Sequence, residues 1–141
     1  MVVAAMVIYV AILLVALVIS VAGLWKMFVK AGEAGWKSII PVYSGYVMYK
    51  MCWNTKMFWI ALVVNIILTV TLRIDNVFAY IICFIFAIAN LVIFAKQNVY
   101  MAKAFGKGIP MGLLLLVFPV IGDLILGFGK AEYIGNQSET K

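Results

Sequence analysis

Apolar residues gather into four long runs along this chain, and most of the charged residues lie in the stretches between them. The runs cover residues 2–24, 57–72, 77–95 and 109–128. A helix of about 20 apolar residues crosses the hydrocarbon core of a bilayer, and the first run has that length without a single charge. The pattern predicts an all-α integral membrane fold, a four-span helical bundle that forms one domain over residues 1–130.

The boundaries of these runs predict how the helices connect. No basic residue precedes the first run, and the run exceeds the apolar core of a signal peptide, so we interpret it as a retained helix. Only residues 73–76 separate the second and third runs, which predicts a tight antiparallel hairpin. The fourth run contains Pro119 and Gly122, where we expect a break or kink. Residues 131–141 are predicted to form a polar, mobile tail.

Composition and charge indicate that lipid solvates this chain and suggest its orientation. Of 141 residues, 67% are hydrophobic and 11% charged, whereas soluble domains are roughly half apolar and about a quarter charged. The net charge is +6, but the lysines form no dense block, which disfavours nucleic-acid binding. Eight basic residues lie in the loops after the first and third runs, against three elsewhere. The excess of basic residues on cytoplasmic loops then predicts both long loops in the cytoplasm and both termini outside.

Residues 32–56 are too patterned to be a simple connection. All four tryptophans lie between residues 25 and 59, and tyrosines recur every three or four residues after Pro41. Tryptophan and tyrosine prefer the headgroup level of a bilayer, so we predict a re-entrant or interfacial helical pair. The aromatic and lysine side chains of this segment have two open interpretations. They could anchor the segment in a membrane surface that includes anionic lipid, or they could form a docking face for a partner protein. The candidate residues of this face are Lys30, Trp36, Lys37, Tyr43, Tyr46, Lys50 and Trp53.

Two short segments resemble each other where the first and third helices should end. "VKAGEAG" at residues 29–35 matches "AKAFGKG" at 102–108, and a proline follows each within an apolar stretch. Glycine just past a helix end accepts the left-handed conformation at little cost, so both segments are predicted to be helix stops. The similarity is compatible with a parallel internal repeat, but we favour the alternative of two unrelated helix ends.

Four polar residues lie within or beside the apolar runs and need an explanation, because unpaired polar groups are costly in hydrocarbon. Asn65 and Asn90 could hydrogen-bond to each other or to backbone, as a helix–helix contact, or could contact a ligand. Asp123 could pair with Arg73 or Lys130, or could bind a proton or cation. The candidate intramembrane contacts are Asn65, Asn90, Asp123 and Arg73.

The sequence offers no recognisable catalytic chemistry. It contains no histidine and only two cysteines, which excludes the commonest general base and gives no metal-binding spacing. Ser38 and Ser44 lie near Lys37 and Lys50, and a serine–lysine pair is chemically possible, yet nothing in the spacing enforces it. We therefore predict no catalytic residue, no cofactor and no metal site.

Three blocks together resemble a known family. Residues 31–37 read Ala-Gly-x-x-Gly-Trp-Lys, residues 40–43 read Ile-Pro-x-Tyr, and residues 102–108 read Ala-Lys-x-Phe-Gly-Lys-Gly. In this order they are similar to a family of small bacterial multi-span membrane proteins of unknown function. Its members are often labelled signal peptidase I because related segments occur joined to that peptidase. The peptidase's β-rich catalytic domain has no counterpart here, and Lys130 stands where the family often has aspartate.

These observations favour a non-enzymatic role in the bacterial cytoplasmic membrane. The leading hypothesis is a subunit or scaffold that binds a partner membrane protein. The partners we expect are the lipid bilayer, including anionic lipid, and either a membrane protein or further copies of this chain. The alternative is a small transporter or channel-like oligomer with a polar path near Asn65, Asn90 and Asp123.

Overall fold

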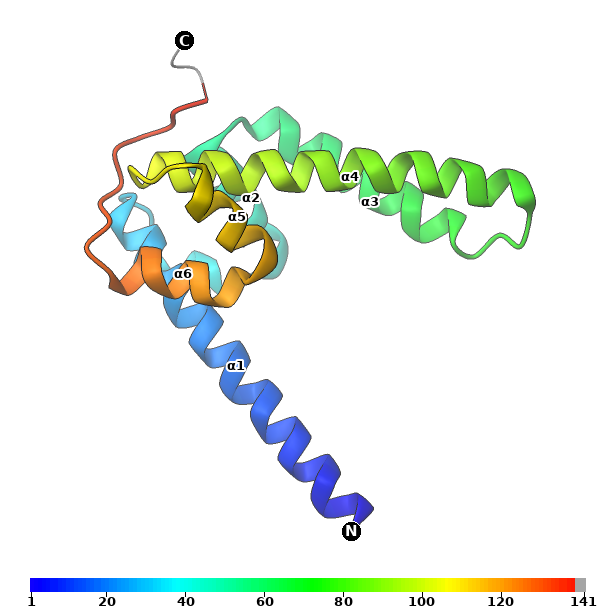
Figure 1. The fold of residues 1–141 in the computed structure, drawn as a ribbon, viewed down its shortest axis with the longest axis horizontal. Helices are drawn as coiled ribbons and strands as arrows, with labels where there is room; N and C mark the ends of the chain where they lie inside the picture. The colour runs from blue at the N-terminus through cyan, green and yellow to red at the C-terminus, as the bar shows by residue number, and fades with distance from the viewer. Residues whose placement is uncertain (139–141) are drawn as a thin grey trace.

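The computed structural model describes residues 1–138 and shows only helices, turns and extended segments there, which confirms the all-α prediction (Figure 1). In chain order the elements are α1 (Val2–Lys30), the short 3₁₀ helix η1 (Gly35–Ser38), α2 (Pro41–Cys52), α3 (Thr55–Thr71), α4 (Val77–Ala104), α5 (Ile109–Val117) and α6 (Pro119–Phe128).

Local sequence signals begin most of these helices. The side chains of Asn54 and Asn76 accept hydrogen bonds from backbone N–H groups two residues later, which caps α3 and α4. Pro41 and Pro119 occupy the first positions of α2 and α6, where the missing N–H has no helical partner to lose. The hairpin predicted from residues 73–76 is confirmed, since α3 and α4 pack against each other on either side of it.

Both predicted glycine stops are confirmed, and they have the same geometry. Gly32 and Gly106 adopt φ values of 78° and 69°. After α1, the Glu33 N–H donates to the Phe28 carbonyl at 2.8 Å, and after α4 the Lys107 N–H donates to the Ala102 carbonyl at 2.8 Å. These bonds define Schellman caps. The likeness of the two short segments is therefore explained by a shared way of ending a helix.

The core lies where the ends of the two long helices meet the shorter helices. Buried side chains from α1, α2, α4, α5 and α6 form one cluster, which includes Phe28, Val47, Phe105, Leu115 and Leu126. We call this packed region the head. It comprises the C-terminal parts of α1 and α4, the elements η1, α2, α5 and α6, and the segment 129–138 that follows them.

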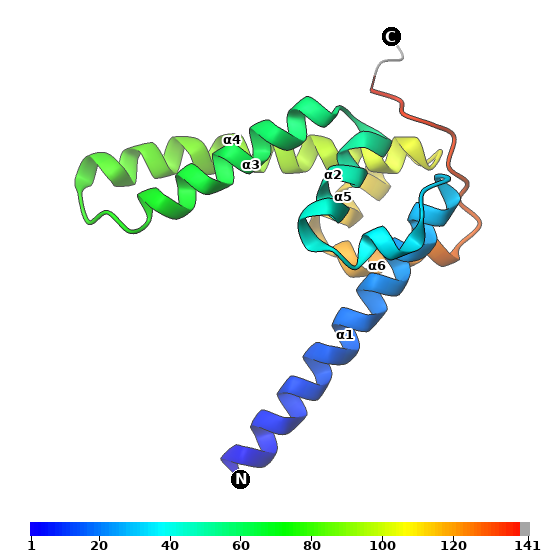
Figure 2. The same ribbon diagram turned by 180° about the vertical axis from the view of Figure 1, so that it is seen from behind.

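Two apolar arms leave the head in different directions, as Figures 1 and 2 show from opposite sides. One arm is the N-terminal part of α1, whose residues 1–19 are all exposed. The other is the hairpin of α3 and the first half of α4. Within the described residues, α1 and α4 are long and apolar enough to cross a membrane.

The fourth apolar run forms two helices instead of one span. The chain breaks at Phe118, as the proline predicted, and α5 and α6 have 9 and 10 residues. Because an α-helix rises only about 1.5 Å per residue, neither is long enough to cross a bilayer by itself. In this structure α5 packs on α4 and α6 packs on α1. The four-span bundle is therefore not confirmed, because α1 does not pack on the hairpin and the fourth run folds back into the head.

Glycine allows α6 to pack closely on α1. A Cβ atom on Gly127 would lie 2.5 Å from the carbonyl oxygen of Gly23, and one on Gly23 would lie 3.2 Å from the backbone of Asp123. Small residues let two helix backbones approach in this way, which is common between membrane helices. This close crossing joins the last helix of the chain to the first.

Candidate functional site

Eight aromatic side chains form a continuous row from η1 through α2 and α3 to α4. The ring centroids of neighbouring members lie 5.2 to 6.4 Å apart, in stacked, tilted and edge-to-face pairs. The α2 members recur at three-residue steps and so share one face of that helix. The aromatic row consists of Trp36, Tyr43, Tyr46, Tyr49, Trp53, Phe58, Trp59 and Tyr100.

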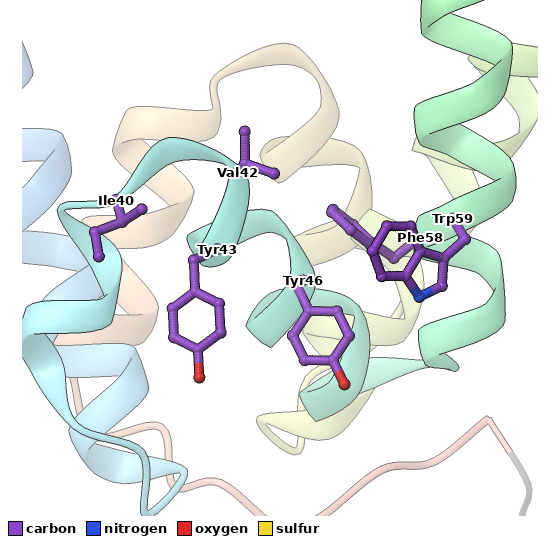
Figure 3. A pocket seen from close by; sticks show the side chains of 6 residues that line it. All are labelled: Ile40, Val42, Tyr43, Tyr46, Phe58 and Trp59. Atoms are coloured by element: carbon purple, nitrogen blue, oxygen red, sulfur yellow. The ribbon is translucent and has the colours of Figure 1, made fainter.

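An open groove lies between the row's α2 and α3 members. Its volume is about 350 Å³ and its lining is almost wholly apolar, from Ile40, Val42, Tyr43, Tyr46, Phe58 and Trp59. Figure 3 shows the rings of Tyr43 and Tyr46 pointing the same way from α2, with Phe58 and Trp59 on α3 beyond them. Phe58 is buried, whereas Trp59 and Val42 are 57% and 63% exposed. The aromatic groove therefore presents large apolar side chains at the surface of the head.

A three-residue ion cluster lies beside the groove. The Glu33 carboxylate accepts hydrogen bonds from the ammonium groups of Lys37 and Lys50, at 2.5 and 2.9 Å. These bonds hold the pKa of Glu33 below its usual range and raise that of Lys37. The Lys37 ammonium also lies 5.7 Å from the ring centroid of Tyr43. Glu33 therefore links η1, through Lys37, to α2, through Lys50. With two lysines and one glutamate, the cluster has one net positive charge.

Six of the seven residues predicted for the interfacial face lie together, and Lys30 lies apart. Trp36, Tyr43, Tyr46 and Trp53 belong to the aromatic row, and Lys37 and Lys50 to the ion cluster. The Lys30 ammonium instead donates to the carbonyls of Leu126, Gly129 and Ala131, at 2.7, 2.9 and 2.7 Å. It thus caps the C-terminus of α6, where a cation is favourable.

The segment after α6 holds the head together, a role that sequence reasoning missed. The Tyr133 hydroxyl donates to the Met51 carbonyl at 2.7 Å, and the Ile134 N–H donates to the Ala104 carbonyl at 2.8 Å. The Asn136 side chain donates to the Trp53 carbonyl. The tail expected to be mobile is therefore attached to α2 and α4 as far as residue 138, and residues 139–141 lie outside the described part. The apolar Tyr-Ile pair within a polar tail was the available signal.

Asp123 lies on a different part of the fold from the other predicted intramembrane polar residues, which belong to the hairpin. The Asn65 side chain donates to the Ala61 carbonyl of its own helix at 2.7 Å. Of the bonds considered for Asn65, this is the one to backbone. Asp123 lies on α6, which contacts α1 and α5 but neither helix of the hairpin. Among residues 1–138, the only ion pairs are those of Glu33, so the expected pairing of Asp123 with Arg73 or Lys130 does not form. The half-buried Asn90 lies on α4 of the hairpin.

Ser38, considered above as a possible nucleophile, and the thiol of Cys52 are both buried in the head. The buried Ser38 hydroxyl donates to the Gly35 carbonyl at 2.8 Å, and the neighbouring Lys37 is paired with Glu33. The Cys52 thiol is buried against α4, and burial raises its pKa to about 12. The structure therefore assembles no serine–lysine pair from these residues. Within the described part of the chain, no cluster of three or more metal-ligating side chains occurs.

Comparison with known proteins assigns a family to this architecture. No curated protein and no solved structure matches the chain. The model of a family of unknown function, DUF5684, matches residues 36–136, which extend from η1 to the tail contacts with α2. That match includes the aromatic groove, the hairpin and both short helices α5 and α6. The chain belongs to this family of unknown function.

Proposed function

We propose that this protein is a non-enzymatic integral membrane subunit or scaffold, and that its aromatic groove binds an apolar helix of a partner membrane protein. The observation behind this proposal is the groove itself, a surface hollow of about 350 Å³ lined by exposed aromatic and aliphatic side chains. The other features of the fold support a membrane location and a binding role.

The two arms are the membrane-embedded part in this proposal. Residues 1–19 are exposed on every side, and so are most large apolar residues of the hairpin, which water would solvate poorly. Nine of the eleven basic residues lie in or next to the head, and Arg73 lies at the far end of the hairpin. This distribution favours a head on the cytoplasmic side of the bacterial cytoplasmic membrane. Because α5 and α6 fold back, the C-terminal segment then lies with the head and the N-terminus opposite.

The position and the side chains of the groove support a helix as its ligand. Phe58 and Trp59 belong to the first turns of α3, so the groove opens where the hairpin leaves the head. Helices of partner proteins dock by laying one apolar face into such grooves. Tyrosine and tryptophan are enriched among the residues that dominate binding energies, because they bury a large area at low entropic cost. Trp59 and Tyr43 are accordingly the residues expected to contribute most.

The ion cluster gives the groove a polar rim. Lys37 and Lys50 remain partly exposed at their side chains, by 20% and 54%, while Glu33 is only 15% exposed. A polar rim around an apolar centre is typical of specific protein interfaces. The rim's one net positive charge would favour an acidic residue or helix C-terminus on the partner.

Site-specific crosslinking in native membranes tests this proposal. A photoreactive amino acid at position 43 should give one stoichiometric adduct with another membrane protein, whereas the same probe at Phe78, which lies at the exposed tip of the hairpin, should not. Trp59→Ala should weaken the adduct, and Phe78→Ala should leave it unchanged. A chain that is recovered only as a homo-oligomer, or an adduct equally strong from both probes, would contradict partner binding at the groove.

A further inference from the structure

We propose that α4 carries a binding site for the phosphate group of an anionic membrane lipid, between Lys96 and Lys103. The site lies directly beyond the apolar part of α4, outside the aromatic groove. It rests on the membrane placement proposed above, but not on the binding of a partner protein.

A hollow in the protein surface marks this site. Its volume is about 230 Å³, and its lining residues are Ala95, Lys96, Val99, Tyr100 and Lys103. These positions are spaced by three and four residues, so they share one face of α4 with a lysine toward each end. A water molecule occupies about 30 Å³ of liquid. The hollow is therefore large enough for a phosphate group that displaces several waters.

Lys96 and Lys103 have no carboxylate partner within residues 1–138, in contrast to Lys37 and Lys50. Lys37 and Lys50 share the Glu33 carboxylate, and Lys30 donates to three carbonyls. Lys96 and Lys103 are exposed and have no ion pair within residues 1–138. Each ammonium thus retains its full capacity to donate hydrogen bonds to an anion.

Tyr100 lines the hollow together with the two lysines and indicates the depth of the site in the bilayer. Its ring lies 5.8 Å from the Lys103 ammonium and 5.2 Å from the ring of Trp53, the end of the aromatic row. Aromatic rings of this kind lie in the headgroup layer of a bilayer, and lysines there reach phosphate with their stems still in apolar surroundings. A lipid headgroup is consequently the phosphate source that lies at the correct depth.

Native mass spectrometry of the full-length protein in detergent provides the test. With equal amounts of phosphatidylglycerol and phosphatidylcholine, the wild type should retain phosphatidylglycerol preferentially. A lysine at a membrane surface strengthens anionic lipid binding about fivefold, so Lys96→Gln with Lys103→Gln should weaken retention about 30-fold. Arginine at both positions should preserve it. The matched control is Lys56→Gln with Lys130→Gln, which removes the same charge from two exposed lysines outside the hollow and should weaken retention much less.

Several outcomes would overturn this site. They are equal retention of both lipids, an equal loss in the Lys56 and Lys130 control, or competition by millimolar inorganic phosphate as effective as that by lipid. Carbonate extraction of the cell membranes from which the protein is purified tests the proposed membrane placement separately. If the wild type stays in the membrane but shows no lipid preference, the phosphate site alone is refuted. If carbonate releases it, the membrane placement is refuted as well.

Discussion

Replacement of Lys30 by methionine should loosen the head. The Lys30 ammonium joins the end of α1 to the end of α6 and to the following segment, through three carbonyl acceptors 96 to 101 residues away in sequence. Methionine keeps the apolar stem and the helix propensity of lysine but cannot donate. The substitution therefore removes the polar link with little change in packing.

The size of the effect follows from these contacts. A hydrogen bond contributes about 0.5–1.5 kcal/mol net, and the lower half of that range applies because this lysine is only half-buried. A cation at a helix C-terminus adds about 0.5 kcal/mol. Fixing the lysine side chain costs about 1.5 kcal/mol in rotamer entropy, which offsets part of this gain. We expect Lys30→Met to destabilise the closed head by about 0.5–2 kcal/mol, the sum over its three hydrogen bonds and the helix terminus less the entropy.

Cys52 provides the assay, because its thiol is fully buried in the head and has a raised pKa of about 12. In a Cys83→Ser background, a maleimide dye should label Cys52 only when the head opens. A free-energy change of about 1.4 kcal/mol is tenfold in an equilibrium constant. Lys30→Met should therefore speed labelling about 2- to 30-fold, whereas Lys56→Met, at an exposed lysine, should not. Labelling at the wild-type rate, or an equal change in the Lys56 variant, would refute the role assigned to Lys30.

Three further predictions address the helix crossing, the C-terminal segment and the orientation. Gly127→Ala places a Cβ atom 2.5 Å from a backbone oxygen and should speed Cys52 labelling, whereas Gly45→Ala, which meets only the Phe58 side chain at 3.3 Å, should be nearly neutral. Burial raises the pKa of Tyr133, so its contribution to holding the tail is present below about pH 10 and lost as pH rises through the folded pKa. Subtilisin cleavage between residues 130 and 138 should therefore accelerate above about pH 10 in the wild type. Tyr133→Phe should reduce this pH dependence, and Lys30, whose ammonium also holds this segment and whose pKa is lowered by burial, should account for the rest. A fluorescent protein fused to the C-terminus should be bright and a fused alkaline phosphatase inactive, and the reverse would contradict the cytoplasmic head.

Features that depend on neighbouring residues could be predicted from the sequence. The helix stops at Gly32 and Gly106, the hairpin at residues 73–76 and the break at Pro119 all appear where expected. Each follows from backbone chemistry within a few residues, so no knowledge of the tertiary fold was needed. The gathering of Tyr43, Tyr46 and Tyr49 along α2 follows from helical periodicity in the same way, and Trp53 joins them just past the end of that helix.

Features that depend on distant packing could not be predicted in this way. The run 109–128 is as apolar as a span, and only the burial of Leu115 and Leu126 in the head shows that its two halves fold back. Hydropathy cannot separate a short buried core helix from part of a membrane span, because both are apolar. Lys30 was likewise predicted to be a surface anchor because it is a lysine near a helix end. Its three acceptors lie far away in sequence, so the sequence could not indicate them. The tail contacts of Tyr133 were missed for the same reason.

The limits of the family match indicate where functional tests should concentrate. The match begins at Trp36 and so excludes α1, although Met27 and Phe28 of α1 are completely buried in the head. The buried part of α1 supplies mainly apolar volume, and hydrophobic side chains of similar size can substitute for one another in a core. The groove residues Tyr43 and Trp59 need a particular ring geometry, and they lie inside the match. A chain whose α1 arm is replaced by an unrelated apolar helix, with residues 23–35 kept, should therefore retain the groove's crosslink to its partner.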